Sequence, residues 1–197
     1  MDGGLEQPQI DEIEYLKLTD ELKREMPDLL TDIKNPLDGF KKDEYEQAFL
    51  AYIKEHDDIL REIEDVYVCS TNAKEGMQTL AQEFVEYVKT SLETETKKRK
   101  RSQKLMDYNM ILVVYLFPAL LKQNQRSGEA FAKALLQEWK QAFPKTNLHL
   151  ASYEEIAEGF RQRFCYITTA VCQSLNKGDN CCLLYTSPSP RDRSLSR

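Results

Sequence analysis

The chain has 197 residues, of which 41% are hydrophobic and 30% are charged, so it holds enough apolar material for one globular core. A formal net charge of −6 excludes a protein whose whole surface is built to hold nucleic acid or an anionic membrane, although a local basic patch still allows such contacts. The N-terminus lacks the apolar stretch of a signal peptide, and the longest apolar run, 110–121, is well short of the roughly 20 residues of a membrane helix. We therefore expect a cytoplasmic protein without a membrane partner.

Residues that form turns are scarce in the middle of the chain. Only seven glycines and seven prolines occur, and most prolines lie in the first forty or the last ten residues. Short strands need frequent turns, so this distribution favours helices. We predict an all-α fold with an irregular N-terminal arm containing short helices over 1–40. A bundle of about four to five helices, one of them long, is predicted over 41–181, and a disordered tail over 182–197.

The predicted arm is interrupted by residues that end helices, namely Pro8, Pro27, Pro36 and Gly39. Thr19 is placed to cap a short helix between two of these interruptions, because its hydroxyl oxygen can accept from a free N–H of the first turn. Pro27 then stops that helix. The arm is therefore expected to contain only one or two short helices.

A regular apolar seam runs through residues 43–68. Its members recur at alternating spacings of four and three residues, which is typical of a helix with one buried face. They are Tyr45, Phe49, Tyr52, His56, Ile59, Ile63 and Val66. We predict one helix over this range. Because His56 belongs to the seam, we expect it to be buried beside Phe49 and Ile63 as a hydrogen-bonded structural histidine.

A second helix is predicted to start after Asn72, a residue type that often caps helix N-termini. Its seam turns polar over 94–101, but no glycine or proline intervenes there. Glutamates also stand four residues before basic residues in this stretch, which is the favourable order for ion pairs on a helix. We therefore predict one long helix from Ala73 to Leu121, kinked near Pro118, rather than two helices joined by a loop.

Two more helices are predicted further along the chain. The first is expected to begin near Ser127 and end at Phe143, because a proline follows. The second is expected to start at Ser152, since Glu155 three residues later completes a capping box. Its apolar periodicity extends to Leu175, after which turn-forming residues end it.

The most distinctive segment lies between residues 164 and 172. It contains, in order, a cysteine, an aromatic residue, isoleucine, a small residue, threonine and alanine, which are Cys165, Tyr166, Ile167, Thr168, Thr169 and Ala170. This order resembles the motif of uncharacterised bacterial proteins called CFI-box C-terminal proteins. The resemblance covers only residues 164–181. That family has no assigned activity, so the resemblance implies a bacterial relative but no reaction.

The last residues do not resemble a natural protein segment. Residues 182–192 resemble an in-frame translation of a sequencing adapter, and 187–194 lack the apolar periodicity that would repay their ordering entropy. A natural Ser/Pro/Arg tail that binds RNA is the alternative. We expect the gene to be cut at about Cys181, with its own C-terminal segment missing. Residues 166–175 are apolar at several angles around a helix, so that segment or a protein partner is expected to cover them.

Two hypotheses involve the cysteines. Cys165 and Cys172 lie seven residues apart, about 10.5 Å along a helix axis, which is too far to share a zinc ion or a disulfide. A zinc site would need non-helical backbone, with Cys181 and His149 converging on it. A thiol enzyme would use Cys165 as nucleophile and His149 or His56 as base. Buried cysteines and a solvated His149 are the commoner outcome, so we expect no metal and no cofactor.

One basic run suggests binding of phosphate groups, and it consists of Lys97, Lys98, Arg99, Lys100 and Arg101. Such runs are more often solvated helix faces. The chain has no Walker, dinucleotide-binding, Cys-x-x-Cys or His-Glu-x-x-His motif, which disfavours common nucleotide and metal enzymes. The leading hypothesis is a helical interaction or scaffold protein without catalytic activity. The alternative is a nucleic-acid or phosphate-binding accessory protein that uses the basic run, and a cysteine-dependent enzyme comes third.

Overall fold

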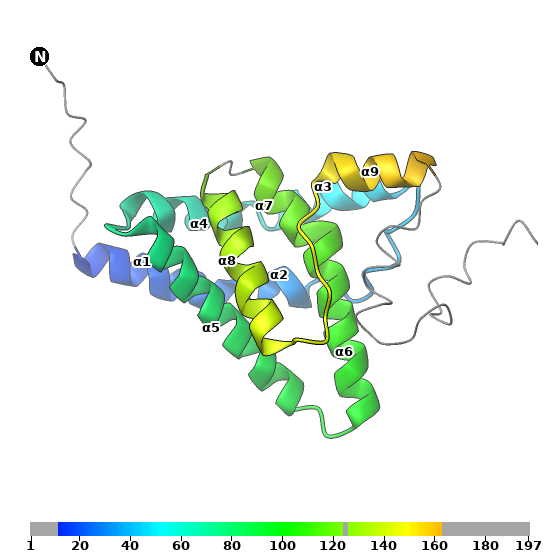
Figure 1. The fold of residues 1–197 in the computed structure, drawn as a ribbon. Helices are drawn as coiled ribbons and strands as arrows, with labels where there is room; N and C mark the ends of the chain where they lie inside the picture. Colours follow the sequence, from blue (N-terminus) through cyan, green and yellow to red (C-terminus); the bar gives the residue numbers. More distant parts are fainter. Residues whose placement is uncertain (1–11, 124–125, 163–197) are drawn as a thin grey trace, which may run out of the picture.

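Helices account for the regular secondary structure in the part of the chain that the structure describes, residues 12–123 and 126–162. In this computed structural model they follow the order shown in Figure 1: α1 (Glu12–Glu25), α2 (Asp28–Thr31), α3 (Tyr45–Glu55), α4 (Asp57–Cys69), α5 (Ala73–Glu93), α6 (Lys98–Ile111), the π-helical turn η1 (Leu112–Leu116), α7 (Phe117–Gln123), α8 (Ser127–Ala142) and α9 (Tyr153–Gln162). The predicted all-α fold is confirmed over these residues.

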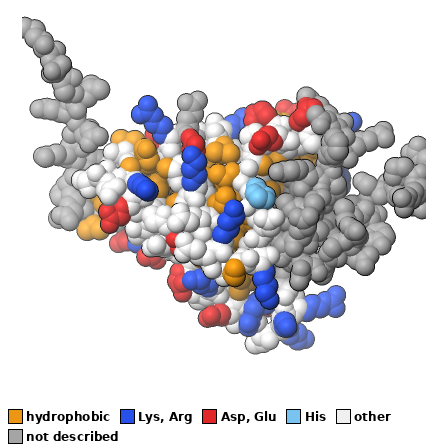
Figure 2. Space-filling view, viewed as in Figure 1, with side chains coloured by type: hydrophobic (Ala, Val, Ile, Leu, Met, Phe, Trp, Pro, Cys, Tyr) orange, Lys and Arg blue, Asp and Glu red, His pale blue; other side chains and the backbone are white. Residues whose placement is uncertain are grey.

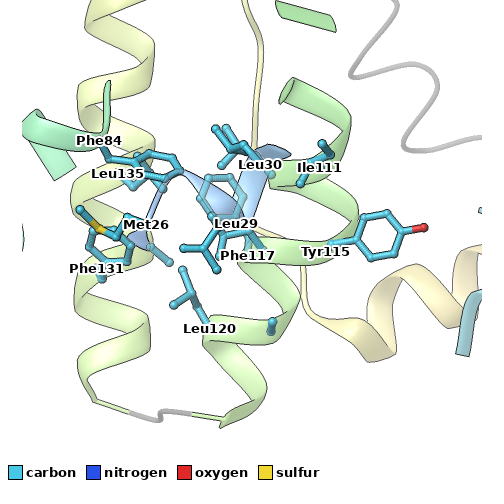
Figure 3. Close-up of a cluster of buried hydrophobic side chains, with 14 of the residues drawn as sticks. Met26, Leu29, Leu30, Phe84, Ile111, Tyr115, Phe117, Leu120, Phe131 and Leu135 are labelled. Carbon is cyan, nitrogen blue, oxygen red and sulfur yellow. The ribbon is translucent and has the colours of Figure 1, made fainter. Parts of the chain in front are cut away.

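The core is built around one continuous helix that comprises α6, η1 and α7 and runs from Lys98 to Gln123. Every residue from Tyr108 to Leu120 is buried, so this mostly apolar part of the helix is packed on all sides, with the polar Asn109 among its buried residues. Figure 3 shows side chains of the α1–α2 segment, α5 and α8 around it, which include Met26, Leu29, Leu30, Phe84, Phe131 and Leu135. One long helix was predicted and one is present, but it spans Lys98–Gln123, and the predicted range Ala73–Leu121 was wrong.

By length and composition, this helix is apolar enough to cross a membrane. However, most of the apolar part of this helix is buried inside the fold, and a buried core helix can have the same length and apolar composition. Phe117 and Leu120, for example, are completely covered by other parts of the chain. Packing within the protein therefore accounts for the hydrophobicity of this helix.

Residues 12–31 form helices α1 and α2 and contribute to the core, where the sequence predicted an irregular arm. The buried side chains of this stretch are Leu22, Met26, Leu29 and Leu30. α1 is already helical at Glu12, so Thr19 lies inside the helix and its hydroxyl donates to the carbonyl of Tyr15 at 2.8 Å. The prediction that Thr19 caps a helix was wrong. Burial against α4 and α5 stabilises a helix that the short apolar groups alone did not indicate.

The predicted single helix over 43–68 is divided into α3 and α4 at His56. The backbone of His56 leaves the helical region, with φ −108° and ψ 17°. Its ring Nδ1 lies 2.9 Å from the carbonyl oxygen of Tyr52, which also accepts the backbone N–H of His56. Asp57 and Asp58 then occupy the first turn of α4, where negative charge is favourable because the helix dipole is positive at that end.

His56 itself is buried as predicted, with 1% of its surface exposed, and its seam neighbours Phe49 and Ile63 are also buried. Its ring Nε2 lies 3.2 Å from the carbonyl oxygen of Asp28 and 3.5 Å from the carboxylate of Asp32. Both ring nitrogens therefore contact oxygen atoms of neighbouring segments. His56 thus connects α2 to the junction of α3 and α4, which is the structural role that the sequence predicted.

The predicted helix over 73–121 is also divided, because residues 94–97 form a turn between α5 and α6. The hydroxyl of Thr94 donates to the carbonyl of Ser91 at 2.8 Å, and local side-chain bonds of this kind compete with helix formation. The side chains in this stretch are polar, so burial does not favour a straight helix here. α5 and α6 therefore form a hairpin, and Figure 1 shows its turn at the far end of the molecule from α9.

The backbone is irregular where the sequence predicted a kink. Directly before Pro118 the helix widens into η1, in which the N–H of Phe117 donates to the carbonyl of Leu112. Pro118 has no N–H, so the carbonyl of Val114, four residues earlier, lacks its usual helical donor. The hydroxyl of Tyr45 donates to that carbonyl at 2.8 Å. A side chain from α3 thus compensates for the proline in the central helix.

Three predicted helix starts are confirmed by the structure. The side chain of Asn72 accepts from the backbone N–H of Glu75 at 3.4 Å and caps α5. α8 begins at Ser127. The capping box of α9 is complete, because the N–H of Glu155 donates to the hydroxyl of Ser152 at 3.2 Å and the N–H of Ser152 donates to the carboxylate of Glu155 at 2.8 Å.

Candidate functional site

The basic run lies at the turn between α5 and α6. Lys97 is the N-cap residue of α6, the four basic residues after it form the first turn of that helix, and all five are exposed. Figure 1 places this turn at the end of the hairpin, and Figure 2 shows Lys and Arg side chains gathered at the same end of the molecule. We refer to residues 94–104 as the hairpin tip.

Two basic side chains of the hairpin tip hold the turn together. The guanidinium of Arg101 donates to the carbonyl of Glu95 at 2.9 Å. The ammonium of Lys104 donates to the carbonyl of Ser91 at 3.1 Å and lies 3.8 Å from the carboxylate of Glu95. The last carbonyls of a helix have no partner within it, and cations near that end are favourable. Lys104 therefore stabilises the C-terminal end of α5, and Arg101 stabilises the turn that follows it.

The other four cations of the hairpin tip have no such role. The ion pairs among the described residues involve none of Lys97, Lys98, Arg99 and Lys100. Lys97 also provides no side-chain cap for α6, whose first backbone hydrogen bond runs from the N–H of Arg101 to the carbonyl of Lys97. These four positive charges therefore stand at the positive end of a helix dipole without an ion-pair partner among the described residues.

The arrangement of these four cations suits a polyanion. With 3.6 residues in each helical turn, four consecutive side chains point in directions spread around the helix axis. The first N–H groups of α6 point out of the same end and have no carbonyl partner in the helix. Side-chain cations and backbone donors thus converge on one end of α6, where phosphate or carboxylate oxygens are favourable ligands.

The sequence alone did not reveal two features of this site. It missed the helix N-terminus, because the break at residues 94–97 was interpreted as continuous helix. It also gave Arg101 the same role as its neighbours, and it omitted Lys104. The available signal was the pair of threonines at positions 94 and 96, whose β-branched side chains lower helix propensity in a stretch without apolar residues.

The residues of the zinc and thiol hypotheses are not brought together by the described part of the chain. His149 is exposed in the segment between α8 and α9. Cys165, Cys172 and Cys181 lie outside the described residues, as do the segment 164–181, the predicted end of the last helix and the tail from residue 182. Within 12–123 and 126–162, no group of three or more His, Cys, Asp or Glu is placed to hold a metal. Both hypotheses stay predictions.

A group of acidic side chains lies on α1 and α4, with Glu62 at its centre. Burial raises the pKa of Glu62, and the nearby carboxylates of Glu25, Glu21, Asp58 and Asp65 raise it further by repulsion. One carboxylate oxygen of Glu62 is buried and has no hydrogen-bond partner among the described residues. Ionised Glu62 is therefore expected to destabilise the fold.

The sign of this effect leads to a prediction. Because the pKa of Glu62 is higher in the folded chain than in the unfolded one, the free energy of unfolding decreases as the pH rises through the folded pKa. At neutral pH, Glu62→Gln is expected to raise the free energy of unfolding by roughly 0.5–1 kcal/mol, since it removes several like-charge contacts. Urea unfolding at pH 7 and at about pH 4 measures this gain, which should shrink at the lower pH. The control is Glu46→Gln in the first turn of α3, where negative charge is favourable, so it should give no gain; equal gains in the two variants would contradict the prediction.

Comparisons with protein-family models, with curated proteins and with solved structures give no match to this chain. The resemblance of residues 164–181 to the CFI-box motif therefore stays a prediction.

Proposed function

We propose that this protein is a helical interaction or scaffold protein that acts by binding rather than by catalysis. Its binding surface is the hairpin tip, and its partner is a polyanion. The observation that carries the proposal is the set of four exposed cations around the N-terminus of α6, which form no ion pair with the described residues. In a chain with a net charge of −6, such a local reversal of charge is suited to attract an anionic partner.

The energetics of the hairpin tip support the same proposal. Positive charges near a helix N-terminus oppose the helix dipole, and neighbouring like charges repel each other. The four cations are therefore expected to weaken the fold that carries them, in contrast to Arg101 and Lys104, which bond to the turn after α5 and to the last turn of α5. A cluster that lowers stability is better explained by binding than by a structural role. An anion at the tip would relieve both sources of repulsion.

Two charge variants test the proposal. The tip variant replaces the four uncompensated cations by glutamine, as Lys97→Gln, Lys98→Gln, Arg99→Gln and Lys100→Gln. The scattered variant removes the same amount of charge from exposed lysines elsewhere, as Lys34→Gln, Lys74→Gln, Lys140→Gln and Lys145→Gln. The two variants have equal net charge, so a difference between them reports the position of the charges.

Retention on immobilised heparin, a generic polyanion, is the measurement. The native chain and the scattered variant are expected to be retained at low salt, while the tip variant is expected to elute at clearly lower salt, because it lacks the clustered cations. Urea unfolding should show the tip variant to be as stable as the native chain or more stable by about 1 kcal/mol, which excludes misfolding as the cause. If the two variants elute together, the hairpin tip is not the binding surface.

A further inference from the structure

We propose that the partner of the hairpin tip is the phosphate backbone of a double-helical nucleic acid, which the tip binds without reading base sequence. This inference rests on the proposed function and names the partner of the same site. Three observations carry it: the distribution of the cations around α6, the free backbone N–H donors at its N-terminus, and the small number of exposed aromatic and amide side chains at the tip.

The distribution of charge distinguishes a nucleic acid from an acidic protein surface. Four consecutive cations surround the end of α6, because each residue advances about 100° around the axis. A flat acidic surface on a folded protein lies on one side of this end and reaches only some of the cations. A duplex groove is bordered by two phosphate backbones, so anions are present on both sides of a helix end placed against it. The tip is thus matched to two rows of phosphates.

The backbone at the start of α6 favours phosphate as the anion. The N–H groups of the first turn point out of the helix end, and Lys97 leaves them without a side-chain cap. A phosphate oxygen accepts several such N–H groups at once, and the helix dipole adds to the attraction. The lysine and arginine side chains around this end then contact the neighbouring phosphates of the same backbone.

Apart from its lysine and arginine side chains, which bind phosphates as well as bases, the hairpin tip offers few groups for reading bases. The ring of Tyr108, whose centroid lies 6.0 Å from the ammonium of Lys104, is buried, and its hydroxyl contacts the hydroxyl of Ser91. Gln103 is the amide side chain of the tip, and it donates to the carboxylate of Asp107 at 2.9 Å. Stacking on aromatic rings and paired hydrogen bonds to base edges are the usual means of recognising bases. Binding is therefore expected to be independent of sequence and strongly dependent on salt.

The salt dependence can be stated in numbers. Each neutralised phosphate of duplex DNA contributes about −0.9 to the slope of log affinity against log salt concentration, so four contacts give about −3.6. Between 50 and 200 mM salt the affinity of the native chain should therefore fall about 150-fold. A single Lys98→Gln variant should have a slope reduced by about 0.9. The tip variant should lose measurable binding over this range of salt concentration.

Fluorescence anisotropy of the full chain with two labelled DNA duplexes of unrelated sequence is the test. We expect equal affinities for the two duplexes, the slope given above, and loss of binding in the tip variant with retention in the scattered variant. Both variants keep the arginines near the C-terminus, so binding by those residues would persist in the tip variant and would overturn the inference. A tenfold preference for one duplex would also overturn it.

The failure of this inference can be separated from failure of the proposed function. Polyglutamate and vesicles containing phosphatidylserine are measured beside the duplexes. If heparin retention depends on the tip but the duplexes do not bind, the tip binds another polyanion, and the inference is wrong while the proposed function stands. Tighter binding of polyglutamate or of the vesicles than of duplex DNA also overturns the inference and identifies an acidic protein or a membrane surface as the partner. If heparin retention does not depend on the tip, both proposals fail.

Discussion

Replacing Trp139 with alanine is expected to lower the free energy of unfolding by about 3–5 kcal/mol, because the variant loses a large buried side chain and leaves a cavity. Trp139 lies on α8 and is completely buried. Its indole N–H donates to the side-chain oxygen of Asn109 in the central helix at 2.9 Å, and its ring centre lies 5.0 Å from that of Phe143. Without the indole, the fully buried side chain of Asn109 loses this partner, which adds to the loss from packing.

Urea unfolding of Trp139→Ala, of Trp139→Phe and of Lys140→Ala measures this effect. The phenylalanine variant keeps most of the apolar volume and loses the hydrogen bond, so it should lie between the other two. The total free energy of unfolding of a domain is roughly 5–15 kcal/mol, so Trp139→Ala can lose most of it. If the alanine variant is unfolded, Trp139→Phe still gives a measurable urea midpoint. Lys140 is the exposed neighbour of Trp139 on the same helix, and its replacement should change little. Stabilities of Trp139→Phe and Lys140→Ala within a few tenths of a kcal/mol of each other would contradict the assigned role of Trp139.

Periodicity predicted the helices of this fold but not the places where they break. The apolar seam continues in phase through His56, because Tyr52, His56 and Ile59 are all buried although the backbone leaves the helix between α3 and α4. A break at a single residue does not change the spacing of the apolar residues on either side of it, so this spacing alone cannot reveal the break. The signal that remained was the pair Asp57 and Asp58, which suits the first turn of a new helix.

The break between α5 and α6 was missed for a different reason. Possible ion pairs four residues apart favoured continuous helix through Glu95. In the structure, the carboxylate of Glu95 lies near Lys104 and its carbonyl accepts from Arg101, so both groups close the turn. An exposed helical ion pair contributes only about 0.2–0.5 kcal/mol, and a hydrogen-bonded turn offers as much. Sequence spacing could not decide between these two arrangements.

The sequence predicted the basic run, but it did not predict which of its residues stabilise the turn and which remain exposed around the end of α6. The sequence identifies five adjacent cations, yet their roles depend on which way the chain turns at residues 94–97. The turn brings the guanidinium of Arg101 to the carbonyl of Glu95 and leaves Lys97, Lys98, Arg99 and Lys100 around the helix end. This division comes from tertiary geometry, which no one-dimensional pattern contains. This difference in roles is the reason that the tip variant replaces Lys97, Lys98, Arg99 and Lys100 and keeps Arg101.

Replacing Tyr45 with phenylalanine is expected to lower the free energy of unfolding by about 1–3 kcal/mol, although only one oxygen atom is removed. Tyr45 on α3 is 2% exposed, and its hydroxyl donates to the carbonyl of Val114 at 2.8 Å. Pro118 cannot supply the helical N–H for this carbonyl, so the variant leaves a buried acceptor without that donor. Burial raises the pKa of Tyr45 well above its usual value, so the hydroxyl stays protonated and donates throughout the ordinary pH range.

Tyr115→Phe provides the matched control for this experiment, because it removes the same atom from a tyrosine whose ring centroid lies 6.3 Å from that of Tyr45. The hydroxyl of Tyr115 donates to the carbonyl of Pro36 at 3.4 Å, a long hydrogen bond, and burial raises the pKa of Tyr115 to about 12. Its loss should therefore lower the free energy of unfolding by less than half as much as the loss of the Tyr45 hydroxyl. Urea midpoints at pH 7 compare the two variants. Equal midpoints would mean that the carbonyl of Val114 does not depend on Tyr45, and that the central helix accommodates Pro118 through η1 alone.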